Sequence, residues 1–393
     1  MPFSVSAPCA RTRPPTNSGE PPVLNAFARL LSGILLAVAL ISPAAAETIT
    51  IKDAYDREVE VPANPDRILL GFYFEDFFAV GGEDAYDRVV AISRSPWEGW
   101  RGLQWKAYVK AVPRIDTIAD VGEVDSGTFS LEAALAAKPQ VAILAGWQYN
   151  ALGDGVQRLE AAGIPVVVLD FNAQTVEKHV ASTLALGQIL GAEDRASELA
   201  MSYKAAVEDV TKRLEGVTAR PKVYVELARK GADEVDNSYG NTMWGRLIET
   251  AGGTNIAATE IEKWGPLSPE YVLAQTPEVI FLAGSGWLGR DKAVIMGPGI
   301  DSSLSHDRMQ PYTHRAGWGG LSAVQDGNIH AIYHGGARTL YDYVFLQYLA
   351  KALHPELFAD VDPEANLEAF FAKYMPIQFK GTYMTRLPDP ANG

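Results

Sequence analysis

The longest regular pattern of apolar and polar residues lies in the middle of the chain. From Gln174 to Leu214, apolar residues recur every three or four positions with charged residues between them, which is typical of an amphipathic helix. Gly187 and Gly191 interrupt the pattern, and the acids Glu193 and Asp194 favour the start of a new helix after them. We therefore expect a long helical segment that breaks or bends once, near these glycines.

Short apolar runs lie on both sides of this segment, and helical patterns separate them. Alternating residues at 48–51 and 58–61 flank a turn and predict a small hairpin. Buried strands are expected at 68–70, 89–92, 141–144, 164–169, 222–226, 279–282 and 329–333. Strands that alternate with helices predict parallel sheets covered on both faces. The sequence therefore indicates an α/β protein with two lobes, each a mostly parallel sheet flanked by helices.

The long helical segment, residues 174–215, is predicted to join an N-terminal lobe at 47–173 to a C-terminal lobe at 216–393. We call this segment the spine. At 393 residues and 47% hydrophobic, the chain is long and apolar enough to bury a core in each of two lobes.

The first 46 residues have the pattern of a secretory signal peptide. Three arginines precede an apolar run from Leu30 to Ile41, and small residues up to Ala46 form an A-x-A cleavage site. The run is too short for a lasting membrane anchor, and a buried N-terminal helix is the less favoured alternative. We therefore expect export and cleavage after Ala46.

Cleavage would leave a strongly acidic chain without cysteine. The full sequence has a net charge of −14, and residues 1–46 contribute +2, so the remainder carries −16. This charge disfavours binding to nucleic acid or anionic lipid. The only cysteine, Cys9, precedes the cleavage site, so the exported protein has no disulfide, thiolate metal site or lipid-modified cysteine.

One motif occurs twice, once on each side of the spine. Residues 130–143 and 268–281 both read Ser-x-Glu, an apolar helix, Pro seven residues after the Glu, and a strand. An acid in the first helical turn is common in any protein, so Glu132 and Glu270 each have an ordinary structural explanation. Their matching positions in both halves indicate a shared role.

These features resemble the periplasmic substrate-binding proteins of ABC importers for iron-siderophores, haem and vitamin B12. The resemblance covers nearly all of the chain after residue 46, including 67–70, both Glu-to-Pro segments, the spine and the run 349–358. It implies a monomeric periplasmic receptor without catalysis or cofactor. It also implies that Glu132 and Glu270 dock into arginine-lined pockets of an inner-membrane permease, where opposite charges set register and encounter rate. The loop region 97–127 is longer than in the family pattern.

In two-lobed α/β proteins the ligand lies between the lobes, off the carboxyl ends of the strands. The aromatic and cationic residues in the loops at these strand ends suit a large planar ligand with anionic oxygens, such as a ferric chelate or haem. Core packing or a solvated surface position is the alternative for each single residue. The expected ligand-binding residues are Tyr73, Arg94, Trp97, Trp147, Tyr149, Tyr239, Trp264, Trp287, Arg290, His334, Arg338 and Tyr341.

The function that we expect is capture of a chelated metal compound. A ferric siderophore is the first candidate ligand, and haem and cobalamin are the next candidates. Direct binding of a metal ion is an alternative. On a strand, His330 and His334 would lie about 13 Å apart, at about 3.3 Å per residue, and could share an ion only if the strand ended between them. If a ferric ion is bound directly, tyrosines together with His334 are better suited as ligands than the pair His330 and His334.

An enzyme is the less favoured class. Residues 284–289 match G-x-G-x-x-G after a strand, but no helix and second strand complete a dinucleotide-binding unit. Trp287 and Leu288 would also crowd a pyrophosphate. The sequence has no G-x-S-x-G, H-E-x-x-H, Walker or C-x-x-C motif, which leaves a secreted hydrolase with an unrecognised site as the remaining enzymatic alternative.

Overall fold

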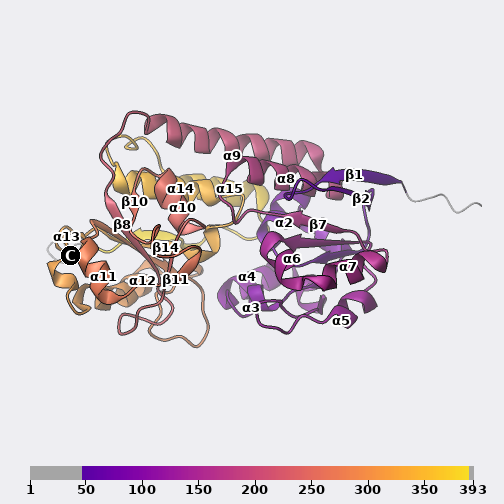
Figure 1. Cartoon of the computed structure of the whole chain (residues 1–393), viewed down its shortest axis with the longest axis horizontal. Coiled ribbons are helices and arrows are strands. Elements are labelled where there is room, and N and C mark those ends of the chain that lie inside the picture. Colours follow the sequence, from indigo (N-terminus) through magenta and orange to yellow (C-terminus); the bar gives the residue numbers. More distant parts are fainter. Residues whose placement is uncertain (1–46, 389–393) are drawn as a thin grey trace, which may run out of the picture. The chain divides into compact units, whose positions relative to one another are not determined.

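Two five-stranded sheets form the centres of two lobes (Figure 1). The computed structural model describes residues 47–388, so the expected signal peptide lies outside the described residues. In the N-terminal lobe the strand order is β5-β4-β3-β6-β7, and all pairs are parallel. The strands are β3 (Ile68–Leu70), β4 (Val89–Ile92), β5 (Ala119–Asp120), β6 (Val141–Ala145) and β7 (Val166–Leu169). Strands β3, β6 and β7 are buried along their whole length, as expected of a parallel sheet covered on both faces.

Helices surround this first sheet, and an antiparallel hairpin precedes it, as predicted. The hairpin is β1 (Thr48–Lys52) and β2 (Glu58–Pro62). The helices are α2 (Phe74–Gly81), η1 (Glu83–Arg88), α3 (Ser95–Glu98), α4 (Gly102–Ala111), η2 (Pro113–Thr117), α5 (Leu131–Ala136), α6 (Gly146–Leu152) and α7 (Asp154–Ala161). Segment 97–127, expected to be a loop region, instead contains the second half of α3 and all of α4, η2 and β5.

The sheet of the C-terminal lobe has the order β10-β8-β12-β14-β16, in which only β16 is antiparallel to its neighbour. These strands are β8 (Lys222–Leu227), β10 (Thr254–Asn255), β12 (Val279–Gly284), β14 (Ile329–Tyr333) and β16 (Met384–Arg386). Two small antiparallel pairs join β9 (Asn237–Tyr239) to β11 (Trp264–Pro266) and β13 (Gly297–Pro298) to β15 (Gly381–Thr382). The expected two-lobed α/β fold with mostly parallel sheets is confirmed.

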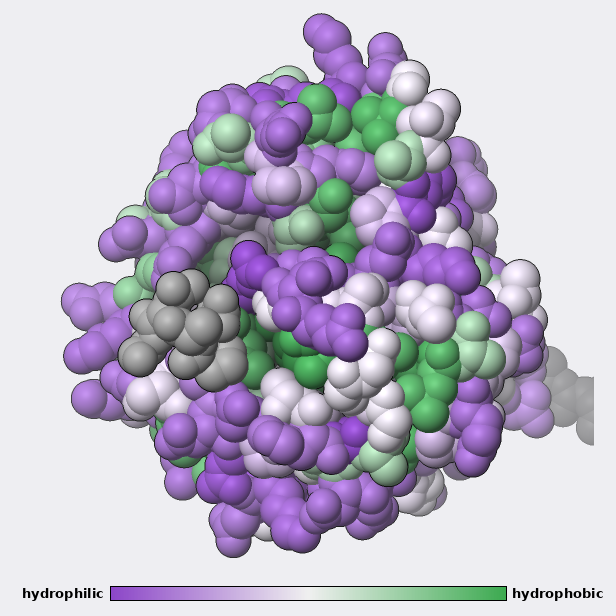
Figure 2. All heavy atoms as spheres, turned by 90° about the vertical axis from the view of Figure 1, so that its left-hand side faces the viewer, coloured by the Kyte–Doolittle hydropathy of each residue, from purple (hydrophilic) through white to green (hydrophobic). Residues whose placement is uncertain are grey.

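Helices pack around the sheet of this lobe, and one of them, α14, contacts the spine. They are α10 (Trp244–Thr250), α11 (Pro269–Gln275), α12 (Ser302–Met309), η3 (Gln310–His314), η4 (Trp318–Gly320), α13 (Ser322–Gln325), η5 (His334–Gly336), α14 (Asp342–Leu353) and α15 (Pro363–Tyr374). No helix among residues 47–388 is both long and apolar enough to cross a membrane. Figure 2 views this lobe from its end, where hydrophilic residues cover most of the surface and hydrophobic ones show mainly in recesses.

The spine consists of two helices rather than one bent helix. Helix α8 (Val176–Leu190) ends at Gly191, whose φ of 64° is the left-handed conformation typical of a helix C-terminus. Helix α9 (Glu193–Arg213) then packs back along α8, and a Cβ at Gly187 would lie only 2.3 Å from the Cβ of Ala196. Helix α9 contacts both α2 and α14, and Figure 1 shows it running from one lobe to the other. The expected break is therefore present, and α9 alone spans the lobes.

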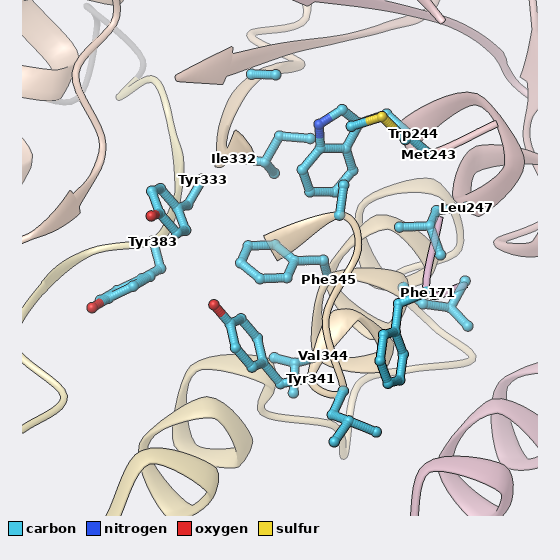
Figure 3. Packing of buried hydrophobic residues seen from close by; sticks show 14 of the residues in the cluster. Phe171, Met243, Trp244, Leu247, Ile332, Tyr333, Tyr341, Val344, Phe345 and Tyr383 are labelled. Atoms are coloured by element: carbon cyan, nitrogen blue, oxygen red, sulfur yellow. The ribbon is translucent and has the colours of Figure 1, made fainter. Parts of the chain in front are cut away.

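The two lobes share one continuous apolar core. Figure 3 shows part of it, with Phe171 of the N-terminal lobe and Leu247 and Val344 of the C-terminal lobe in one cluster. Polar contacts also cross between the lobes, including a hydrogen bond from the backbone N–H of Leu103 to the carbonyl of Gly286 at 3.0 Å. The lobes of this structure are therefore closed upon each other.

Candidate functional site

The first part of the site lies where β3 ends and α2 begins. Tyr73, the residue before α2, has a φ of 59°, which is uncommon and costly for an aromatic residue. Its hydroxyl donates to Asn172 Oδ1 at 2.7 Å and accepts from the backbone N–H of Phe171 at 3.2 Å. These bonds hold the loop so that Phe72 and the first turn of α2 line a small cavity between the lobes.

Two buried arginines meet at this cavity, one from each lobe. Arg101 precedes α4 and is 4% exposed, and Arg338 lies between β14 and α14 and is 9% exposed. The ring of Phe72 contacts both guanidinium groups, with its centroid 5.6 Å from Arg101 Cζ and 5.0 Å from Arg338 Cζ. The geometry brings two positive charges of different lobes to one aromatic side chain.

These guanidinium groups are incompletely paired. Arg101 Nε and Nη2 and Arg338 Nε are buried and have no hydrogen-bond partner among residues 47–388. Burial lowers the pKa of Arg338 to about 9, and the positive charge of the neighbouring Arg101 is the second cause. Arg338 is therefore still cationic at neutral pH. A buried charge without a counter-ion destabilises a protein unless a partner neutralises it. The donor set therefore fits an anion.

Two acidic residues of α2 lie beside the arginines and tie the lobes together. Glu75 accepts hydrogen bonds from the hydroxyls of Tyr108 at 2.7 Å and Tyr341 at 2.8 Å, and its Oε2 lies 3.7 Å from Arg101 Nη1. Asp76 accepts from the backbone N–H of Leu340 at 2.6 Å. Burial raises the pKa of Glu75 and raises that of Asp76 strongly. Because burial disfavours their charged forms, these carboxyls counter the two arginines only weakly.

A third cluster centres on His334, just after β14. Its Nδ1 atom lies 3.2 Å from Trp244 Nε1 and 3.3 Å from the hydroxyl of Tyr239. Burial, and then the positive charge of Arg338, lowers the pKa of His334 well below its usual value. The imidazole is therefore neutral and belongs to the same electrostatic environment as the arginine pair.

The structure brings half of the expected ligand-binding residues to this region. Tyr73 and Arg338 line the cavity, and Trp147 packs edge-on against Phe72 with ring centroids 5.5 Å apart. Tyr341 bonds to Glu75, and Tyr239 bonds to His334. The residues brought together are therefore Tyr73, Trp147, Tyr239, His334, Arg338 and Tyr341.

Three other expected residues have structural partners elsewhere. The Arg94 guanidinium donates to the backbone carbonyls of Asp116 and Ile118. Trp97 is fully buried and stacks on Phe74 with ring centroids 4.6 Å apart. Tyr149 accepts a hydrogen bond from Arg57 at 3.0 Å, beside the β1–β2 hairpin. The structure therefore does not place these three at the arginine pair.

The last three expected residues follow strands of the C-terminal lobe. Trp287 is 8% exposed. It follows Gly286, which contacts Leu103 in the first turn of α4. Trp264 is 60% exposed and pairs across β11 and β9 with Tyr239. Arg290 is exposed. Of these, Trp264 lies on the same face of its ribbon as Tyr239, because directly opposed residues of an antiparallel pair share a face.

Sequence reasoning missed four residues of the site. Phe72, Glu75 and Asp76 follow β3, but the two acids look like ordinary first-turn residues of a helix. Arg101 falls in the segment that the sequence analysis treats as a loop. The signal that could have found it is the clustering of Trp97, Trp100 and Trp105 around it after a buried strand.

His330 and His334 have different hydrogen-bond partners. His330 is buried, and its Nδ1 lies 2.9 Å from the hydroxyl of Tyr348. The strand ends at Tyr333, and His334 turns toward Tyr239 and Trp244. No group of three or more His, Cys, Asp or Glu side chains within residues 47–388 is arranged to hold a metal ion.

The repeated motif has the same local structure in both lobes. Glu132 is an exposed first-turn residue of α5, and Glu270 is an exposed first-turn residue of α11. Ser130 and Ser268 cap these helices by accepting a backbone N–H three residues later, each at 3.1 Å. Each helix leads into a central strand of its sheet, β6 or β12.

The two lobes, the helix across them and the site between them define the class of the protein. The chain belongs to the Periplasmic binding protein family, which it matches over residues 69–333. It is an extracytoplasmic solute-binding protein of an ABC importer and not an enzyme.

Individual relatives show how far the likeness extends. The structure of the TroA-like periplasmic binding protein FepB from Veillonella parvula is 30% identical, with a TM-score of 0.82 over 86% of this chain and all of that one. The molybdate-binding protein MolA of Haemophilus influenzae is 24% identical, over 84% of this chain and 92% of MolA. A periplasmic haem-binding protein from Pseudomonas aeruginosa is 18% identical, with a TM-score of 0.52 over 74% of this chain and 93% of that one, and shares the fold.

Proposed function

We propose that this protein captures an anionic metal compound between its lobes, with a ferric siderophore as the first candidate, and delivers it to an ABC permease. The observation that carries the proposal is the buried pair Arg101 and Arg338, in which Arg101 Nε and Nη2 and Arg338 Nε have no partner among residues 47–388. Each lobe supplies one of the two cations. An anion between them would replace their mutual repulsion with charge-assisted hydrogen bonds to both lobes.

The aromatic surroundings of the pair support a ligand with planar groups. Phe72 contacts both arginines, and Trp147 and Trp100 pack around Phe72 with ring centroids 5.5 and 6.5 Å from it. Trp147 Nε1 is also buried without a partner among the described residues. Catecholate rings or the ring of haem would pack against such side chains, and their oxygens would accept from the arginines.

Molybdate is the second candidate. The relative MolA, named for binding it, is matched over 92% of its length. The cavity at the arginine pair in this closed structure has room for about one water molecule. A compact dianion would therefore need less separation of the lobes than a siderophore would.

The test measures the binding of a panel of probes to purified residues 47–393. Tryptophan fluorescence and calorimetry detect the binding. The probes are a ferric tris-catecholate, ferric citrate, haem, sodium molybdate and cyanocobalamin, the last as an uncharged metal complex. We expect the ferric tris-catecholate to bind, and Arg101→Met and Arg338→Met each to weaken it at least about tenfold, because each removes charge-assisted hydrogen bonds.

The matched control is Arg94→Met, since the Arg94 guanidinium is occupied by carbonyls of Asp116 and Ile118 away from the site. The Arg94→Met variant should bind the ferric tris-catecholate with the affinity of the wild type. Arg338→Met should be at least as thermostable as the wild type, because it removes an incompletely paired buried charge. Binding of molybdate alone would favour the second candidate. Tight binding of cyanocobalamin that is unaffected by either arginine substitution would contradict the proposal.

A further inference from the structure

We propose that His334 donates a hydrogen bond from Nε2 to an oxygen atom of the bound compound and does not coordinate its metal. The inference rests on the proposed function and narrows the ligand class. It selects oxyanions and metal chelates whose coordination sphere is already complete, over complexes that need a nitrogen ligand from the protein.

The proton position follows from the partners of the other ring nitrogen. Trp244 Nε1 lies 3.2 Å from His334 Nδ1, and an indole N–H can only donate. His334 Nδ1 must therefore accept, and the hydroxyl of Tyr239, at 3.3 Å from the same atom, must donate as well. A neutral imidazole that accepts at Nδ1 carries its proton at Nε2.

Trp244 is itself held rigidly, so this arrangement does not depend on a mobile side chain. It is fully buried at the start of α10 and packs edge-on against Phe345 with ring centroids 5.6 Å apart (Figure 3). The backbone N–H of Met243, just before it, donates to Gln174 Oε1 at 2.8 Å. Trp244 is thus a positioning residue for the His334 ring.

The Nε2–H group is the part of His334 that can meet a ligand. It forms no hydrogen bond within residues 47–388, and His334 is only partly buried, whereas Arg101 and Arg338 are buried. His334 lies four residues before Arg338 on the segment that joins β14 to α14, and Arg338 lines the cavity with Arg101. The free arginine nitrogens and the Nε2–H group of His334 are all donors, so the part of the ligand that faces them consists of acceptor oxygens.

Metal coordination by Nε2 would require the opposite tautomer. The proton would then sit on Nδ1 and point at the N–H of Trp244 and the hydroxyl of Tyr239. One hydrogen bond would be lost and two donors would face each other, in a buried setting where unsatisfied polar groups are costly. The two fixed donors therefore bias the histidine against a role as metal ligand.

The experiment is nitrogen-15 NMR of the histidine rings in residues 47–393, with His334 assigned from the signals missing in His334→Gln. We expect the Nε2–H tautomer in the free protein between pH 5 and 8. In Trp244→Phe, which removes one donor to Nδ1, the Nδ1–H form should become populated. An Nδ1–H tautomer or a cationic ring in the free wild-type protein would overturn the inference.

Binding of the probe that the panel identifies provides the second readout. His334→Gln, whose amide N–H reaches the position of Nε2–H, should keep affinity within about threefold, and His334→Ala should lose about tenfold. If His334→Gln loses as much as His334→Ala and the visible spectrum of the bound complex shifts, His334 is a metal ligand. Failure of every probe to bind would count against the proposed function, whereas the tautomer measurement would still decide the state of His334.

Discussion

Arg338 and Arg315 show how one residue type serves binding at one place and stability at another. Arg315 is also buried, but it forms a two-point ion pair with the fully buried Glu226, with N–O distances of 2.5 and 3.0 Å, and lies between Tyr312 and Trp318. Arg338 forms no ion pair with a carboxylate among residues 47–388, and its Nε is unpartnered. The Arg315 charge is neutralised within the fold, whereas the Arg338 charge is available to an anion.

The buried histidine His330 permits a pH prediction at the same scale. Burial lowers its pKa to about 3 from an ordinary 6.5. Below pH 6.5 the unfolded chain binds a proton at this position and the folded one does not, so the free energy of unfolding falls as the pH falls from 6.5 toward 3. The loss is about 1.4 kcal/mol per pH unit, or about 2 kcal/mol at pH 5.

We expect His330→Asn, which can still contact the Tyr348 hydroxyl but does not titrate, to lose about 2 kcal/mol less stability than the wild type between pH 7 and pH 5. Urea unfolding at both pH values measures the difference. His314→Asn, at an exposed histidine, is the control and should follow the wild type. Parallel losses in wild type and His330→Asn would show that the folded protein also protonates His330 in this pH range.

At the scale of elements, α4 is the segment that closes the site. It belongs to the N-terminal lobe and follows Arg101, yet it contacts the β13 segment of the C-terminal lobe. Its Leu103 donates to the Gly286 carbonyl, and Gly102 packs against Leu288. Movement of α4 away from the C-terminal lobe would withdraw Arg101 from Arg338 and open the cavity between them.

A disulfide between Leu103→Cys and Gly286→Cys should lock this contact. A Cβ at Gly286 would lie 2.8 Å from the Leu103 Cβ, so a shift of about 1 Å reaches disulfide geometry. The only native cysteine is Cys9, before the expected cleavage site. We expect the oxidised variant to block both entry and release of the probe in stopped-flow fluorescence, and reduction to restore them. Unchanged rates in the oxidised protein would show that α4 does not gate the site.

At the scale of the whole molecule, the two lobes present matching acids for a partner. Glu132 and Glu270 are exposed, capped in the same way and placed before equivalent strands. We propose that both dock on the permease. Glu132→Ala combined with Glu270→Ala should leave probe affinity unchanged and abolish uptake by the importer in vesicles, because exposed charges set encounter and register.

The matched control for docking is Glu208→Ala combined with Glu215→Ala, two exposed acids on and just after α9. It removes the same charge from another surface and should transport normally. Equal loss of uptake in both double variants would attribute the effect to net charge, and loss of binding in the Glu132 and Glu270 variant would contradict a pure docking role.

The local pattern of the chain was enough to predict most of the fold. The strands at 68–70, 89–92 and 329–333 match the structure, because periodicity and turn residues act over a few neighbours. The short α4 escaped detection, since its apolar face is completed by residues of the other lobe. Six expected site residues came together because strand ends of a parallel sheet meet at one edge.

The sequence by itself determined the two-lobed α/β class, the break at Gly191 and the paired first-turn acids, which all depend on local spacing. Only the tertiary structure decided which polar residues are left without partners. Arg94 and Arg338 look alike in sequence, but one meets carbonyls of its own lobe and the other meets a second cation across the cleft. That difference arises because partners come from distant segments, whose approach depends on how the lobes pack.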